Sequence, residues 1–551
     1  MARKILVIGL DGMPESLIKK LGKQGIIPNL YRLYKKGVFG SLESTMPPIT
    51  APAWVSFATG VNPGKHGCFN FLKLSKGSLS VNRAITSRDI KSPTLYEILN
   101  LQGKKSILIN LPVSFPPITN DIILTSIMSR GENFIFPQSL KKEMPILKKY
   151  RVSPNPEIAA YGSREKFATE VRRIEKIRFD CAKQLFQKKE WDFFFLLISS
   201  PDWIQHKCFD RLVSGKISKN SESCNIYQDI DKSLGWFLEN IKDDTSLIII
   251  SDHGFKVYEG FFYVNAWLHK EGLLQLQKVR EDFVETPISR LAEEKSLAKK
   301  KKKRIKIERL YNFLVRHPFL FRKITPSYRY IKSLLPFYFD LSATQRPDIP
   351  SSKAVSISIG ANDIYFHDKN RFSDGLLSAD AYRRLLKEVK TELSQLKSPL
   401  SREKLFKKVF AKDEIYSGDY TSFAPDLLLE EKSFKTSKET RPAIFSIQIV
   451  NSHSPDGIFI GYGSEFVKGK RIKNLKIFDI APLILHLLDI PIPKNMDGRI
   501  RRELFDKDSF MAKRAIKTQS YRIKKTFPKK YKEGKEDTEE VKRRLKTLGY
   551  F

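Results

Sequence analysis

Short apolar runs recur along the chain, and charged segments with helical spacing separate them. Six runs have the β-branched and aromatic content of strands: Ile5–Leu10, Ser106–Leu111, Phe193–Ser199, Leu247–Ser251, Leu427–Glu430 and Ile458–Gly461. Most of these runs are continuous rather than alternating, which is typical of parallel strands buried on both faces. Strands that alternate with helical segments predict a doubly wound α/β core, with a mostly parallel sheet between two layers of helices.

The pattern changes after about residue 268. We expect residues 1–268 to form the N-terminal part of the core, 269–350 a basic insertion or cap, 351–500 the rest of the core, and 501–551 a basic tail ending in a helix over Glu539–Leu548. The insertion carries the basic run Lys299–Arg304. It fits either a solvated helical cap, which we favour, or a basic amphipathic helix on a membrane surface.

The charge balance indicates an anionic partner. The 551 residues include 98 Lys and Arg against 61 Asp and Glu, a net charge of +37, while a hydrophobic content of 41% argues against disorder. Anionic lipid, nucleic acid and phosphorylated or sulfated substrates would all be attracted. No helix-turn-helix signal or basic strand interleaved with aromatic residues accompanies the charge, so specific nucleic-acid binding has little support.

The cysteines and the longest apolar runs bear on location. Cys68, Cys181, Cys208 and Cys224 show neither the spacing of a thiolate metal site nor that of a disulfide framework. We therefore expect a reducing, cytoplasmic setting, with peripheral contact to an anionic membrane as the further option. Each apolar run is far shorter than the ~20 residues that a transmembrane helix needs.

Acidic and imidazole side chains follow the predicted strands. They are Asp11 after the first run, Asp202 and His206 after the third, Asp252 and His253 after the fourth, and His453 further along. Alone, each is better explained as a helix cap or a hydrogen-bonded histidine. Together they offer nitrogen and oxygen ligands for two divalent ions, of which zinc is the first choice and Mn²⁺ the second. Two such ions ~4 Å apart can assist phosphoryl transfer.

Thr50 is the candidate nucleophile. It lies in the segment Pro47-Pro-Ile-Thr-Ala-Pro-Ala-Trp-Val-Ser-Phe-Ala-Thr-Gly60, directly before a helical run. At a helix N-terminus its hydroxyl would face any bound anion, and contact with a metal would help to make it an alkoxide. Thr50 is equally suited to be a simple N-cap, and the two interpretations are compatible.

These motifs resemble the type I phosphodiesterase and nucleotide pyrophosphatase family of the alkaline phosphatase superfamily. The resemblance rests on Asp11-Gly-Met13, Pro28-Asn-Leu30, Thr50-Ala-Pro-Ala-Trp54, Thr59-Gly60, Pro63-Gly-Lys-His-Gly67, Ser200-Pro-Asp-Trp-Ile-Gln-His206, Ser251-Asp-His-Gly-Phe255, His453, Phe478-Asp-Ile-Ala-Pro482 and Met496-Asp-Gly498. They follow the family's order and cover roughly residues 1–265 and 350–500.

The resemblance implies an alkaline phosphatase-like α/β/α sandwich and a two-metal hydrolase of phosphodiester or pyrophosphate bonds. One ion would be held by Asp202, His206 and His453, and the other by Asp11, Asp252, His253 and Thr50. Thr50 would form a phosphothreonine intermediate, which water then hydrolyses. The family also uses an Asn to bind a phosphoryl oxygen, and Asn70 lies near the corresponding position.

Departures from related patterns leave alternatives open. The nucleophile segment lacks the Cys or Ser and the Arg of sulfatases, and Ala53-Trp54 replaces the Asn-His of many nucleotide pyrophosphatases. No cation adjoins Thr50, which favours diesters, although Arg83, Arg88 or a residue of the cap could supply the charge for a phosphomonoesterase or phosphotransferase. A catalytically silent polyanion- or membrane-binding protein is the alternative of another class. The expected substrate is an anionic phosphorylated small molecule, or one linked to lipid or glycan.

Overall fold

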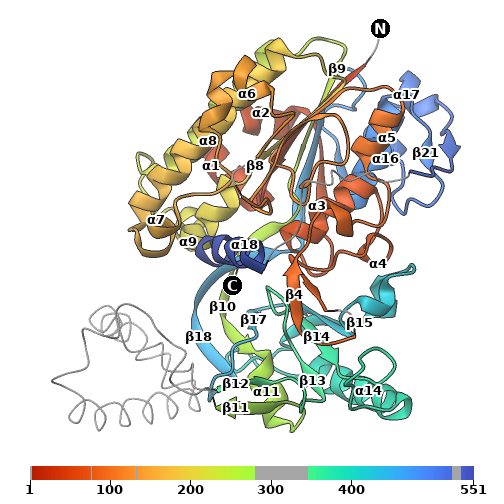
Figure 1. Ribbon diagram of the computed structural model, residues 1–551. Helices are drawn as coiled ribbons and strands as arrows, with labels where there is room; N and C mark the ends of the chain where they lie inside the picture. The colour runs from red at the N-terminus through yellow and green to blue at the C-terminus, as the bar shows by residue number, and fades with distance from the viewer. Residues whose placement is uncertain (1–2, 76, 132–133, 279–344, 524–534, 551) are drawn as a thin grey trace.

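The core is a nine-stranded mixed sheet between two layers of helices (Figure 1). The structure, a computed structural model, describes residues 3–75, 77–131, 134–278, 345–523 and 535–550. The strand order is β20-β2-β19-β9-β1-β8-β5-β6-β7. Pairing is parallel from β9 through β1, β8 and β5 to β6, and also between β2 and β20, whereas β19 and β7 run antiparallel to their neighbours. The predicted α/β sandwich with a mostly parallel sheet is confirmed.

The strands of this sheet are β1 (Lys4–Leu10), β2 (Val38–Glu43), β5 (Ser106–Ile109), β6 (Ile122–Leu124), β7 (Ile135–Phe136), β8 (Phe193–Ile198), β9 (Thr245–Ile250), β19 (Asp456–Tyr462) and β20 (Arg471–Lys476). One layer contains α1 (Glu15–Lys23), α2 (Pro28–Lys36), α8 (Arg164–Lys188), α9 (Ser200–Ser214) and α10 (Glu222–Asn240). The other contains α3 (Thr50–Thr59), α5 (Leu95–Leu101) and α16 (Ile480–Leu487).

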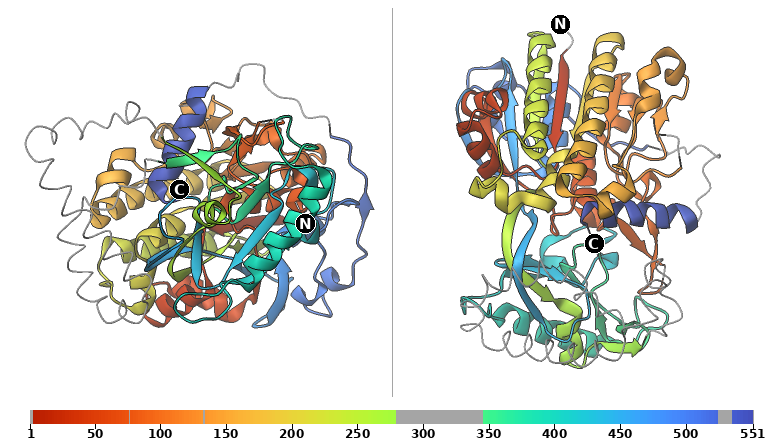
Figure 2. Two further views of the ribbon diagram at one scale, coloured as in Figure 1. Left: turned by 90° about the horizontal axis from the view of Figure 1, so that it is seen from below. Right: turned by 90° about the vertical axis from the view of Figure 1, so that its left-hand side faces the viewer.

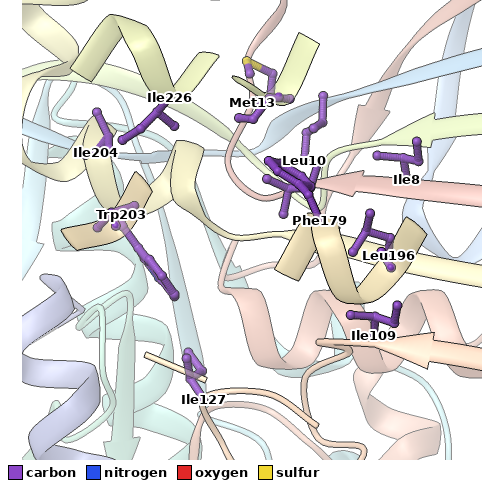
Figure 3. Close-up of a cluster of buried hydrophobic side chains, with 14 of the residues drawn as sticks. Ile8, Leu10, Met13, Ile109, Ile127, Phe179, Leu196, Trp203, Ile204 and Ile226 are labelled. Atoms are coloured by element: carbon purple, nitrogen blue, oxygen red, sulfur yellow. The ribbon is translucent and has the colours of Figure 1, made fainter. Parts of the chain in front are cut away.

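Strand β1 shows how the sequence divides the core. Successive side chains point to opposite faces, so Leu6, Ile8 and Leu10 join one cluster of buried side chains while Ile5 and Val7 join the other. Both sets are buried, which explains why the run is continuously apolar. Figure 3 shows part of the first cluster, where Ile8 and Leu10 lie near labelled residues of α8 and β8.

A second lobe with its own hydrophobic core lies below the sheet (Figures 1 and 2). Its strands are β10 (Gly254–Tyr263), β11 (Gln275–Lys278), β12 (Gln345–Asp348), β13 (Ala354–Val355), β14 (Asp363–Phe366), β15 (Phe406–Ala411), β16 (Leu427–Glu431), β17 (Phe434–Ser437) and β18 (Phe445–Ser454). Among the described residues its helices are α11 (Val264–Lys270), α14 (Ala379–Gln395) and the short α15 (Lys412–Ile415). The lobe therefore includes residues on both sides of the predicted insertion. Residues 279–344 of that insertion lie outside the described residues.

Two expected parallel strands were wrong in direction. The run at Leu427 forms β16, which pairs antiparallel with β14 and β15 inside the second lobe. The run at Ile458 forms β19, which pairs antiparallel with β9 and β2. The chain leaves the large sheet after β9, crosses the lobe and returns through β18 into β19, so the returning strand runs opposite to the departing one.

The end of the chain returns to the core. Helix α18 (Lys535–Leu548) lies at the junction of the sheet and the second lobe (Figures 1 and 2). The predicted terminal helix over Glu539–Leu548 falls inside it. None of the helices in the described ranges is long and apolar enough to cross a membrane.

Candidate metal centre

The predicted ligands meet where the central strands end. Strand β1 lies between β8 and β9, with Leu10 paired to Ile198 and Gly9 to Ile250, so the carboxyl ends of the three strands are nearly level. The residues that follow are Asp11 after β1, Asp202 and His206 in the first part of α9, Asp252 and His253 after β9, and His453 near the end of β18. Parallel strands place their successors at one edge, as the sequence predicts.

Two groups of side chains have ligand atoms close enough to hold metal ions. Asp202, His206 and His453 form one group, and Asp11, Asp202 and His253 form the other, with all ligand atoms in each group within 4.8 Å of one another. Asp252 adjoins the second group, because its Oδ2 lies 3.5 Å from His253 Nε2. The predicted sets are therefore brought together, with the difference that Asp202 belongs to both groups.

Two of the three histidine rings, those of His253 and His453, are oriented as metal ligands usually are. The Nδ1 atom of His453 lies 3.1 Å from the Pro48 carbonyl, and that of His253 lies 3.0 Å from the Gly254 carbonyl. With Nδ1 donating to the carbonyl, Nε2 is left as an acceptor directed into the centre. His453 Nε2 there faces Asp202 Oδ1 at 3.1 Å and His206 Nε2 at 3.0 Å.

The imidazole rings of the centre carry no positive charge. Burial lowers the pKa of His206, His253 and His453 to about 3, so the rings are neutral at physiological pH. A lone pair of His453 then faces a carboxylate oxygen of Asp202. Such a contact is unfavourable unless a cation or a shared proton lies between the two atoms.

The carboxylates give the same indication. Asp11 Oδ1, both oxygens of Asp202 and Asp252 Oδ2 are buried and lack hydrogen-bond partners among the described residues. Burial, together with the charges of neighbouring carboxylates, raises the pKa of Asp11 and Asp252 well above the usual range. Buried charges require pairing or metal coordination. The donor set therefore fits divalent cations of the zinc type, which prefer imidazole nitrogen and carboxylate oxygen.

Backbone contacts fix the approach of Asp11 to Asp252. Gly12 N donates to Asp252 Oδ1 at 3.3 Å, and Met13 N donates to Ser251 Oγ at 2.8 Å. Gly12 has φ of +66°, and a Cβ at this position would lie 3.1 Å from Asp202 Oδ1. Glycine here permits both the left-handed backbone and the close approach of the carboxylate.

Thr50 is the first residue of α3 and is buried beside the second group. Its Oγ1 lies 3.3 Å from His253 Nε2. Every residue of α3 is buried, and the helix begins at the centre, so its positive N-terminal end faces the place where an anion would bind. The position combines a hydroxyl nucleophile with a favourable field for a phosphoryl group.

Several residues of the resembling motifs support the scaffold instead. His66 Nε2 interacts with Ser56 Oγ at 2.9 Å, and its Nδ1 accepts from Cys68 N. Asp497 accepts from the backbone and side-chain nitrogens of Asn62 at 2.8 and 2.7 Å. These contacts hold the turn after α3 and thereby the helix that carries Thr50.

The structure also places the remaining predicted residues. Asn70 donates from Nδ2 to the Ile359 carbonyl at 2.9 Å, and its Oδ1 accepts from Phe71 N, so its role in binding a phosphoryl oxygen stays a prediction. Arg83 is bound to Asp89 through two contacts of 2.7 and 2.8 Å. That pairing neutralises one of the two cations considered for a monoester.

Sequence reasoning missed a cation from the second lobe. Lys435 of β17 is buried, and its charge contributes to lowering the pKa of His253 and His453. Its Nζ donates to Glu431 Oε2 at 3.0 Å and to Asn362 Oδ1 at 3.2 Å. The charge is therefore largely balanced by Glu431. Because Lys435 is one of many lysines in a basic chain, nothing in the sequence distinguishes it.

Sequence reasoning also missed Tyr550, next to the last residue of the chain. Its ring centroid lies 5.6 Å from that of His206 and 5.8 Å from that of His453. The available signal was the amphipathic spacing of Val541, Leu545 and Leu548 before it, which marks a helix that must bury one face.

Comparisons with known proteins show what the chain is similar to. The model of the family described as type I phosphodiesterase / nucleotide pyrophosphatase matches residues 5–321, more than half of the chain. No curated protein matches. Human ectonucleotide pyrophosphatase / phosphodiesterase 5 is a similar solved structure, with 13% identity over 90% of this chain and 97% of that one and a TM-score of 0.47. An inactive variant of the murine protein, in complex with AMP, has 12% identity over 92% and 100%, with a TM-score of 0.49.

Proposed function

Because the chain belongs to the type I phosphodiesterase / nucleotide pyrophosphatase family, we propose that it hydrolyses its substrate through a phosphothreonine intermediate on Thr50. Hydrolysis of phosphodiester or pyrophosphate bonds is the reaction of that family. The finer proposal is supported by one observation above the others: two groups of ligand atoms share Asp202, and the Thr50 hydroxyl lies beside one of them.

The proposed ligand sets follow the geometry. Asp202, His206 and His453 would hold one ion, while Asp11, Asp252, His253 and the Thr50 oxygen would hold the other. When bound, divalent ions of the zinc type, or Mn²⁺, would polarise a phosphoryl oxygen and stabilise the attacking and leaving oxygens. The backbone carbonyls behind His253 and His453 keep both rings directed at the centre.

Thr50 carries the covalent step. Its Oγ attacks phosphorus, the bond from phosphorus to the leaving oxygen breaks, and the departing group takes up the proton that Thr50 loses. Water then attacks the phosphothreonine, the bond from phosphorus to Oγ breaks, and Thr50 regains a proton. Two in-line displacements give net retention at phosphorus. The N-terminal end of α3 favours the negative charge that both steps place there.

Pairing of two cations, Arg83 and Lys435, favours a diester or pyrophosphate over a monoester. A dianionic monoester gains most from an unpaired cationic clamp. Arg83 is neutralised by Asp89, and Lys435 is held by Glu431. The proposed substrate is an anionic phosphorylated small molecule, free or linked to lipid or glycan, which the net charge of +37 would attract. A cytoplasmic setting and contact with an anionic membrane stay predictions.

The test compares Thr50→Ala with wild type on a chromogenic phosphodiester and its matching monoester, after loading with Zn²⁺. We expect Thr50→Ala to lose about 10³-fold or more in kcat on the diester while retaining its metal content. Thr59→Ala is the matched control, because Thr59 lies on the same buried helix, roughly 13 Å further along, and donates only to the Val55 carbonyl. Diester hydrolysis by Thr50→Ala at the wild-type rate would remove Thr50 as nucleophile.

A further inference from the structure

The extreme C-terminus is packed into the core rather than lying free on its surface. Val541, Leu545 and Leu548 of α18 are fully buried and belong to the main hydrophobic cluster. Arg544, on the same helix, donates to the carbonyls of Ile127 and Ser129. Three apolar anchors and a buried guanidinium with two acceptors fix the helix against the large domain.

The end of α18 turns the next residue inward. Gly549 has φ of +98°, and Tyr550 N donates to the Leu545 carbonyl at 3.2 Å, which is the six-to-one bond of a glycine-terminated helix. A Cβ on Gly549 would lie 3.1 Å from His206 Cγ. The absent side chain lets the chain pass directly over that ring, so the helix terminus directs Tyr550 into the centre.

Tyr550 fills the space beside the reacting residues. Its side chain is only 6% exposed, and its ring packs edge-on against Phe71 at 5.1 Å between centroids. The hydroxyl faces Thr50 and Asp202. No contact of ordinary hydrogen-bond geometry joins it to a described residue, although it lies close enough to Thr50 and Asp202 to interact with both.

A buried hydroxyl that lacks a hydrogen bond of good geometry loses the stabilisation that water would give it. The packing of α18 nevertheless holds this hydroxyl beside Thr50. A phosphoryl oxygen there would accept the hydroxyl proton, and the partner of Tyr550 would then be the substrate itself.

We propose that Tyr550 is a phosphoryl-binding residue of this centre, supplied by the C-terminus of the chain. Its hydroxyl donates to an oxygen of the phosphoryl group that is transferred to Thr50, and its ring forms the wall over His206 and His453. The inference rests on the proposed function, since it requires a phosphoryl group beside Thr50.

The decisive variant is Tyr550→Phe, which removes the hydroxyl and keeps the ring. Tyr150→Phe is the matched control, because Tyr150 is also buried and donates to the Thr125 carbonyl, outside the centre. Inorganic phosphate binding to the full-length, Zn²⁺-loaded protein is measured by calorimetry, and diester turnover is measured alongside Thr50→Ala.

For Tyr550→Phe we expect an approximately tenfold weaker phosphate affinity and a kcat lower by about tenfold or more, with the zinc stoichiometry unchanged. Tyr150→Phe should leave phosphate affinity and kcat near wild type. Unchanged phosphate affinity and kcat in Tyr550→Phe, with Thr50→Ala inactive, would overturn this inference alone. A higher kcat in Tyr550→Phe would also overturn it, by showing that the hydroxyl obstructs the substrate. Wild-type turnover by Thr50→Ala would overturn the proposed function itself.

Discussion

Replacing Gly12 by alanine tests the candidate metal centre, because it adds one methyl group beside the proposed ligands. The residue has φ of +66°, where an L side chain costs about 1–2 kcal/mol. The added Cβ would also lie 3.1 Å from Asp202 Oδ1 and 3.2 Å from His253 Cε1. Both contacts are tight, so these side chains must shift by a few tenths of an ångström. Asp202 belongs to both groups of ligands, and the shift therefore disturbs both.

The chain provides a control that separates strain from contact. Gly25 has φ of +72° and is exposed, and a Cβ there would meet no atom within 4 Å. Gly25→Ala therefore imposes the same backbone cost without touching the centre. Both variants should lose a similar amount of stability, about 1–2 kcal/mol before any gain from a less flexible unfolded chain.

Only Gly12→Ala should weaken metal binding. A displacement of a few tenths of an ångström at Asp202 and His253 predicts roughly a tenfold loss of Zn²⁺ affinity, or about 1.4 kcal/mol, and a similar loss in kcat/KM. Calorimetric titration of the metal-free proteins with Zn²⁺ measures the first, and diester hydrolysis the second. If Gly12→Ala and Gly25→Ala bind Zn²⁺ equally tightly, the assignment of Asp202 and His253 as metal ligands is refuted.

Two further predictions concern stability. Asp231→Ala removes the carboxylate that accepts from Leu30 N at 2.8 Å and from Asn29 N at 3.1 Å, so it should lower the free energy of unfolding by about 1–3 kcal/mol, and an unchanged melting temperature would contradict this role. Metal removal should destabilise the protein more at pH 8 than at pH 5. The pKa of Asp11 and of Asp252 is higher in the folded protein than the value of ~3.9 in the unfolded chain. In the metal-free protein their contribution to stability is therefore complete below pH ~3.9 and is lost as the pH rises through the folded-state pKa. A bound cation prevents this loss. Melting temperatures with and without chelator, compared at both pH values, check the sign, and a constant difference would argue against it.

The sequence predicts the structure best where a pattern of residues is compatible with only one arrangement of the chain. The runs that became β1, β8 and β9 are apolar on both faces because helices cover both, and their polar successors had to lie at one edge of the sheet. The spacing of Asp202 and His206 likewise determined that both would share one face of α9. The gathering of the candidate ligands could therefore be predicted without coordinates.

The direction of a strand, and contacts between residues far apart in the sequence, could not be predicted in this way. The runs that became β16 and β19 resemble parallel strands because an apolar run records burial and not the direction of its neighbour. Tyr550 is 500 residues from Thr50 in a basic tail, and its position depends on how α18 docks. His66 and Asp497, in contrast, look chemical in the sequence, yet their side chains are used to hold a turn.

The pairing of β10 with β18 makes the second lobe a closed excursion from the large sheet. Gly254 is paired with Ser454, so the chain departs and rejoins at neighbouring points although 200 positions separate them. His253 and His453 stand at these two points, stacked with 3.9 Å between ring centroids. The order of the large sheet depends on these two points staying paired and not on the length of chain between them. The second lobe is thus joined to the large sheet at the candidate metal centre, where each crossing of the chain supplies one histidine.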